Sequence, residues 1–112
     1  MTNIYKEISP ISKRKANISF LSNDKEAIAN ALVSVSLHES DWRWAQNKCL
    51  FFLSNSDDDI RGLAATCLGH IARVHKRLDK VKVINELKKR LIDEKIKGNV
   101  EDALQDIEIF LP

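Results

Sequence analysis

Three histidines and two cysteines are the side chains of this sequence that could bind a transition metal. Cys49 and Cys67 lie in apolar segments, where a thiol packs as a small core residue. His70 and His75 are five positions apart, which does not suit two ligands on one helical face. We therefore expect two buried free thiols rather than a disulfide, no metal site and no cofactor.

Ser34, Ser36 and His38 lie close together and raise the question of nucleophilic catalysis. A catalytic serine is commonly exposed on a strained turn, and a glycine-rich loop commonly supports anion chemistry. Neither feature surrounds these residues, and the sequence contains only three glycines. The sequence therefore predicts a protein that is not an enzyme and that has no small-molecule substrate.

Acidic residues form two groups that could bind a cation or face a basic partner. Asp102 and Asp106 are one helical turn apart, so their carboxylates could act together. A solvated helix face with acids near the helix N-terminus explains the same pair, and both interpretations stay open. The run Asp57 to Asp59 is better explained by residues that cap a helix and complement its dipole.

The elements that carry these residues are predicted to be helices, because apolar residues recur at spacings of three and four from about Asn23 onward. Residues 1–22 are ambiguous, and we expect one short or irregular helix there that packs through Ile4, Ile8, Ile11, Ile18 and Phe20. Residues 23–112 are predicted to form five main helices. The first is capped by Asn23 or Ser22 and ends near His38, and the second is capped by Ser40 or Asp41 and ends at the turn 54–56. A long helix capped by Ser56 follows, then one over about Lys80–Lys95, and a last one capped by Gly98-Asn99.

Length and composition predict one globular domain over residues 1–112, with 44% hydrophobic and 30% charged residues. No apolar stretch is long enough to span a membrane, and the first residues lack the apolar segment of a secretory signal, so we expect a cytoplasmic protein. The net charge of +2 is too small to imply a nucleic-acid partner. From Arg61 to Lys97, eleven Lys and Arg residues face four acids, whereas four acids and no base follow Gly98. The last helix is therefore acidic.

The apolar pattern repeats at about forty residues. A shift of forty places Ile60 on Val100 and Cys67 on Ile107, and the matched positions are all apolar except that Leu68 falls on Glu108. This period is typical of helical arrays in which each helix pair buries its apolar face against the next pair.

The segments LFFL at 50–53 and DDDIR at 57–61, followed by Ala64-Ala65, resemble the HEAT repeat signature. The resemblance implies an all-α fold, a right-handed α-solenoid of two to three HEAT-like helix pairs in one compact domain. We expect Arg61 to be structural and to pair with an acidic turn of an adjacent repeat. The resemblance is specific for residues 41–77 and weaker beyond, where Glu101 replaces the arginine.

The segments LGHIAR at 68–73 and VEDALQDI at 100–107, together with Trp42 and Trp44, also resemble short bacterial HEAT-like proteins of toxin–immunity loci. This resemblance implies a cytoplasmic immunity protein that binds and neutralises a cognate protein toxin, such as one delivered by contact-dependent growth inhibition. Its acidic last helix would suit a cationic nuclease, because complementary charge gives rapid and specific association. Such a protein would cover the active site or substrate groove of the toxin.

The second helices of HEAT repeats line the concave side, and this places a candidate binding surface along the polar stripe of the long helix. Trp44 is out of phase with the apolar stripe of its helix, and tryptophan often dominates binding energy, although a packing role is equally open. The predicted partner-binding residues are Trp44, His70, Arg73, Arg77, Asp102 and Asp106, flanked by Thr66 and by Asn30, Ser34 and His38.

Two other functions stay open. A nucleic-acid-binding module would use the basic residues between Arg61 and Arg90, but these have no interleaved aromatic residues and fall on more than one helix face. A protein–protein adaptor is the other alternative, because an array of two to three repeats leaves its terminal faces exposed.

Overall fold

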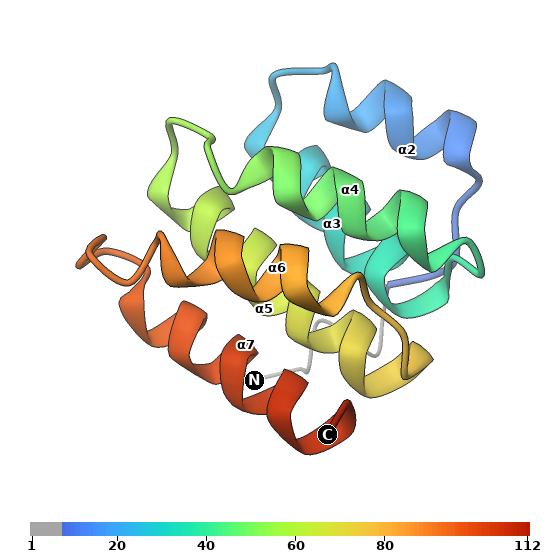
Figure 1. Cartoon of the computed structure of the whole chain (residues 1–112). Coiled ribbons are helices and arrows are strands. Elements are labelled where there is room, and N and C mark those ends of the chain that lie inside the picture. Colours follow the sequence, from blue (N-terminus) through green and yellow to red (C-terminus); the bar gives the residue numbers. More distant parts are fainter. Residues whose placement is uncertain (1–7) are drawn as a thin grey trace.

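The structure is a computed structural model that describes residues 8–112, and these residues form six helices and no strand (Figure 1). The helices are α2 (Lys13–Phe20), α3 (Lys25–His38), α4 (Trp42–Phe52), α5 (Asp58–His75), α6 (Lys80–Lys88) and α7 (Lys97–Phe110). They pack into one globule that measures 31 × 29 × 28 Å, which confirms the all-α prediction for the described residues. None of these helices has the combined length and hydropathy needed to cross a bilayer.

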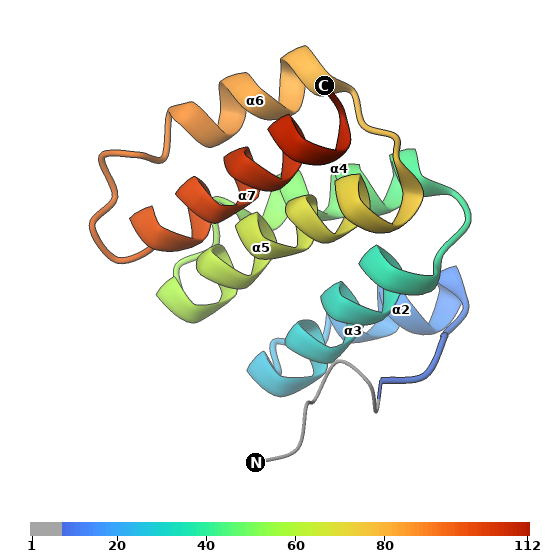
Figure 2. The ribbon, with the colours of Figure 1, turned by 90° about the horizontal axis from the view of Figure 1, so that it is seen from below.

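The helices follow one another as three pairs, α2–α3, α4–α5 and α6–α7 (Figure 2). Figure 2 shows α5 between α3 and α7, and the contact of α5 with α7 is the most extensive between two of the described helices. This arrangement agrees with the expected succession of helix pairs. The right-handed solenoid and its HEAT-like repeat stay predictions.

The core surrounds α5, whose alanines and glycines allow the neighbouring helices to approach closely. Cys67 on α5 and Cys49 on α4 are both free and 0% exposed, which confirms the predicted buried thiols. A hydrogen bond with Cys67, together with burial, raises the pKa of the Cys49 thiol, so this thiol stays protonated. The largest fully buried apolar side chains are Leu32, Val35, Leu53, Ile60, Leu68, Ile71, Val83, Leu87, Ile96, Val100 and Ile107.

The N-terminus of α3 is capped one residue later than predicted. The Asp24 carboxylate accepts hydrogen bonds from the backbone N–H groups of Glu26 and Ala27, so neither Asn23 nor Ser22 is the cap. Asn23 instead adopts a left-handed conformation with φ 60°, which asparagine tolerates better than most residues. In the turn before α3, Asn23 therefore provides the left-handed backbone angle and Asp24 provides the capping side chain.

The cap of α5 is Asp57 rather than the predicted Ser56. Its side chain accepts hydrogen bonds from the backbone N–H groups of Asp59 and Ile60. An aspartate caps as well as a serine, and its charge also complements the helix dipole. The alternative cap of α4 at Asp41 is confirmed, because the Asp41 carboxylate accepts from the backbone N–H of Trp44.

The connection between α6 and α7 differs most from the prediction. α6 ends at Lys88 instead of Lys95, and the chain continues in turns before α7 begins at Lys97. These turns bury Ile96, which is 1% exposed. Gly98 and Asn99 lie inside the first turn of α7 and do not cap it.

The segment before α3 contains a regular helix, α2, which begins after the capping Ser12. Ile8, Ile11 and Phe20 pack against the core as predicted. The prediction for Ile18 is wrong because this side chain is 64% exposed, on a different helix face from Phe20. Ile4 lies outside the described residues.

Candidate functional site

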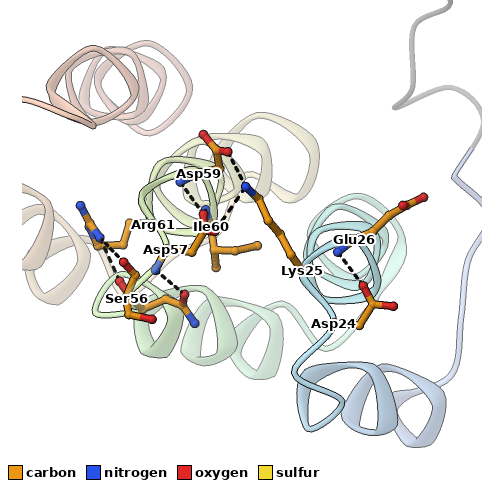
Figure 3. Close-up of polar contacts among 9 residues, drawn as sticks. Asp24, Lys25, Glu26, Ser56, Asp57, Asp59, Ile60 and Arg61 are labelled. Atoms are coloured by element: carbon orange, nitrogen blue, oxygen red, sulfur yellow. Dashed lines mark hydrogen bonds and ion pairs between the residues drawn. The ribbon is translucent and has the colours of Figure 1, made fainter.

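Ion pairs connect each helix pair to the next. At the start of α3, Lys25 Nζ lies 2.6 Å from Asp59 Oδ2 and 3.3 Å from Asp57 Oδ2 on the following pair (Figure 3). At the start of α5, Arg61 Nε lies 3.1 Å from Asp93 Oδ2 in the turns before α7. Arg61 also donates to the backbone carbonyls of Asn55 and Ser56. These contacts agree with the structural role that the sequence predicts for Arg61.

The acidic run at the start of α5 is used by the fold. The carboxylates of Asp57, Asp58 and Asp59 approach within 4.8 Å of one another. Asp57 caps the helix, and Asp57 and Asp59 both contact the Lys25 ammonium. Although burial opposes it, the hydrogen bonds from the Ile60 and Asp59 amides and from Lys25 hold the pKa of Asp57 below its usual value. Capping was predicted for this run, whereas its pairing with Lys25 was not.

We use the name α5–α7 surface for the polar residues along the contact of these two helices, Thr66, His70, Arg73, Asp102 and Asp106. His70 is 8% exposed, and its Nδ1 accepts a hydrogen bond of 3.0 Å from Arg73 Nη2. Burial first, and then the charge of Arg73, lower the pKa of His70 to about 4. Because a guanidinium can only donate, His70 is a neutral imidazole with its proton on Nε2 at neutral pH.

Asp106 lies directly against α5. A β-carbon added to Gly69 would meet Asp106 Oδ2 at 2.6 Å and the Ala103 Cα at 3.3 Å, so the glycine makes room for α7 and its carboxylate. The pKa of Asp106 is raised, mainly by burial and also by the nearby charge of Asp102, although the charge of Arg73 opposes this shift. Asp106 is therefore half-buried in a helix contact, whereas Asp102 is exposed.

The structure brings four of the six predicted site residues to the α5–α7 surface: His70, Arg73, Asp102 and Asp106. Thr66 joins them through a hydrogen bond of 3.0 Å from Asn99 Nδ2 to Thr66 Oγ1. None of the four acids of α7 forms an ion pair with another residue in the range 8–112. The exposed outer side of α7 is therefore negatively charged, with Glu101, Asp102 and Glu108 exposed and Asp106 half-buried beside them.

The α3 part of the predicted stripe is occupied by the chain itself. Ser34 is 2% exposed and donates a hydrogen bond of 2.8 Å to the Ser9 carbonyl. His38 Nε2 lies 3.0 Å from the Ile8 carbonyl. These side chains hold the segment before α2 against α3. Asn30 and His38 are exposed, whereas Ser34 is buried.

Arg77 does not share a helix face with His70 and Arg73. α5 ends at His75, and Lys76 adopts the left-handed conformation at φ 56°, so Arg77 follows the helix in the connection to α6. Arg77 lines a shallow cleft there with the half-buried Trp42. The predicted helical spacing of four from Arg73 therefore gives the wrong position for this side chain.

Trp44 lies on another side of the molecule, in what we call the α2–α4 groove. This groove has a volume of about 610 Å³ and lies between the first helices of two neighbouring pairs. The ring of Trp44 is half-buried, with its centroid 6.4 Å from that of Phe20. The residues that line the groove are Asn17, Phe20, Leu21, Trp44, Asn47, Lys48, Phe51 and Phe52.

Sequence reasoning missed the two most exposed apolar residues of this groove. Leu21 is 83% exposed and Phe51 is 72% exposed. The sequence does contain a signal for Phe51. Adjacent residues of a helix point in different directions, so Phe51 cannot lie on the buried face that Phe52 occupies. Leu21 follows the last residue of α2 and has no comparable signal.

These observations define the class of the protein: an all-helical globule of three helix pairs, linked by ion pairs between successive pairs, with two separate candidate surfaces. No protein-family model and no curated protein matches this chain. Among solved structures, the chain is similar to a chain in the crystal structure of a CDI complex from Cupriavidus taiwanensis LMG 19424. The two chains are 33% identical with a TM-score of 0.86, over 97% of this chain and 98% of that one.

Identity at this level over nearly the whole length of both chains shows common descent. The protein therefore belongs to the same family as that component of the CDI complex.

Proposed function

We propose that this protein is an immunity protein that binds a cognate toxin in the cytoplasm and neutralises it. The observation that carries the proposal is the full-length similarity to a chain of a CDI complex, at a TM-score of 0.86. We take CDI to stand for contact-dependent growth inhibition, in which a cell that makes a toxin also makes the protein that protects it. The sequence resemblance to small proteins of toxin–immunity loci supports the same function independently.

The direct test is to co-express this protein with the protein encoded immediately upstream of it. We expect a stable complex on size-exclusion chromatography and restored growth of cells in which the upstream protein is toxic alone. An unrelated small helical protein at the same expression level is the control and should not protect. Toxicity that persists together with two separate elution peaks would show that the proposed function is wrong.

We further propose that the toxin is a cationic nuclease whose active site or substrate groove is covered by a pre-formed surface. The acidic outer side of α7 supports this. Its exposed acids Glu101, Asp102 and Glu108 form no ion pair within residues 8–112 and can meet a basic surface. Charge complementarity of this kind raises the association rate and rejects wrong partners. No chemistry by the immunity protein itself is required.

The nucleic-acid-binding alternative gains no support from the positions of the basic residues. Arg61 pairs with Asp93, Lys89 Nζ lies 2.8 Å from Glu86 Oε2, and Arg90 donates to Ser54. These three cations are therefore engaged within the fold. Tight binding of free RNA or DNA by this protein at physiological salt would favour the alternative over the immunity function.

A further inference from the structure

The α2–α4 groove combines an aromatic floor with a positive charge, and the toxin contact proposed above for the acidic side of α7 does not explain it. Its floor consists of Phe20, Trp44 and Phe52, with 5.2 Å between the ring centroids of Phe20 and Phe52. Leu21 and Phe51 stand at its edges with most of their surface exposed. Apolar side chains that are exposed together around a groove commonly mark an interaction site.

Cations lie over the aromatic rings of this groove. Lys48 Nζ is 5.4 Å from the ring centroid of Trp44 and 5.9 Å from that of Phe20. Lys13 Nζ is 5.4 Å from the Trp44 centroid, but it is also bound to Asp41 at 2.6 Å. Among residues 8–112, Lys48 has no carboxylate within ion-pair distance. The ammonium of Lys48 is therefore available to an external anion.

Among residues 8–112, no acidic residue lines the groove, and the first turn of α2 beside it contains none either. Lys13, in that turn, is paired with Asp41, so Lys48 is the unpaired cation that lines the groove among residues 8–112. A partner segment that fits must therefore bring an apolar side chain for the floor and negative charge for the edge. Its chemistry is opposite to that of a partner of the acidic α7 side.

We propose that the α2–α4 groove is a second contact site for the toxin and that it receives an aromatic or aliphatic side chain flanked by a carboxylate. The apolar side chain packs between Phe51 and Leu21 over the aromatic floor. The carboxylate pairs with Lys48. This site rests on the proposed function, because the partner is the same toxin.

The test compares two variants that each replace an exposed apolar residue by glutamate. Phe51→Glu removes one edge of the groove, whereas Val81→Glu makes the same change of charge on α6, where Val81 is 75% exposed and lines no part of the groove. We expect Phe51→Glu to weaken binding of the upstream-encoded protein about tenfold or more, as for a central interface residue. Val81→Glu should stay within about twofold of the parent, as surface changes usually do.

A third variant, Lys48→Glu, tests the charge of the groove. We expect it to weaken binding about threefold to tenfold, with a loss that shrinks at high salt because screening weakens exposed pairs. Circular dichroism and the midpoint of thermal unfolding show that each variant folds. Binding is measured by isothermal titration calorimetry.

The outcomes separate the two proposals. A parent protein that does not bind the upstream-encoded protein at all would refute the proposed function. A parent that binds, with Phe51→Glu and Lys48→Glu binding equally well, would refute the groove while leaving the function intact. A parent that forms a dimer, which Phe51→Glu converts to a monomer without weakening toxin binding, would assign the groove to a second copy and also refute the proposal.

Discussion

The contact between α5 and α7 is closely packed, whereas the contact between α2 and α4 leaves a groove open. At the first, a glycine brings the backbones together and Asp106 fills the space above Gly69. At the second, the helices are linked by side chains, through the rings of Phe20 and Trp44 and the pair of Lys13 with Asp41, and a groove is left between them. Asp106 is therefore packed into the closed contact, whereas Leu21 and Phe51 at the open groove are exposed.

This comparison also divides the predicted site residues. His70 is buried and Asp106 is half-buried, and both have perturbed pKa values because they belong to a helix contact. Asp102 is exposed beside them and is the better candidate for direct contact with a partner. Perturbed pKa values often mark functional sites, but structural packing produces them as well.

The largest expected effect comes from filling the closed contact. Gly69→Leu places a side chain where Asp106 Oδ2 and the Ala103 backbone already lie, so we expect a loss of about 3 kcal/mol in the free energy of unfolding. Gly98→Ala is the matched control, because no atom of residues 8–112 outside its own helix turn lies within 4 Å of its added β-carbon. It should stabilise the protein by about 0.5–1 kcal/mol, since alanine is the better helix former. Urea denaturation measures the free energy of unfolding of both variants. A Gly69→Leu variant as stable as the parent would contradict the close packing of α5 against α7.

Acid should weaken the same contact through His70. Its pKa in the folded protein is about 4, below the ordinary 6.5, so the unfolded chain binds more protons between these values. Stability should therefore fall as pH falls from 6.5 to about 4, by roughly 3 kcal/mol from this group. The His70→Gln variant should show a flatter dependence over this interval. Equal slopes for parent and variant in urea titrations would show that His70 does not stay neutral in the fold.

The smallest expected effect concerns the acidic side of α7. Asp102→Lys should weaken binding of the upstream-encoded protein about tenfold, or about 1.4 kcal/mol, because like charges would then face each other. Asp106→Lys is a poorer probe, since this residue packs on Gly69 and its replacement would disturb the fold. The control is Glu94→Lys, an exposed acid outside α7. Calorimetry showing no difference between Asp102→Lys and the parent would leave the α2–α4 groove as the better-supported contact.

Much of the fold could be predicted because helix formation depends on residues within one or two turns. The spacing of Ile28, Leu32 and Val35 predicted a buried stripe, and all three are buried. The same local reasoning failed at the N-termini of α3 and α5, where two neighbouring residues can both act as cap. It also failed at residues 89–95, where the ion pair of Arg61 with Asp93 accompanies turns in place of a longer helix.

The candidate site was less predictable, because its residues come from different helices. Local spacing placed Asp102 and Asp106 on one side of α7 but could not show that Asp106 packs on Gly69. The spacing within α4 shows that Trp44 is out of phase with the core, but its partner Phe20 belongs to a separate helix. Arg77 was misplaced because the left-handed turn at Lys76 ends the helix one residue before it.

By itself, the sequence determined that the chain is helical, that its two thiols are buried and that its last helix is acidic. These properties follow from residue type and from spacing along one helix, which are local. Only the tertiary structure decided that His70 and Asp106 lie at the α5–α7 contact while Trp44 faces a groove elsewhere. The physical reason is that the distance and angle between helices depend on how side chains from separate segments fill the shared space, which no single helix pattern contains.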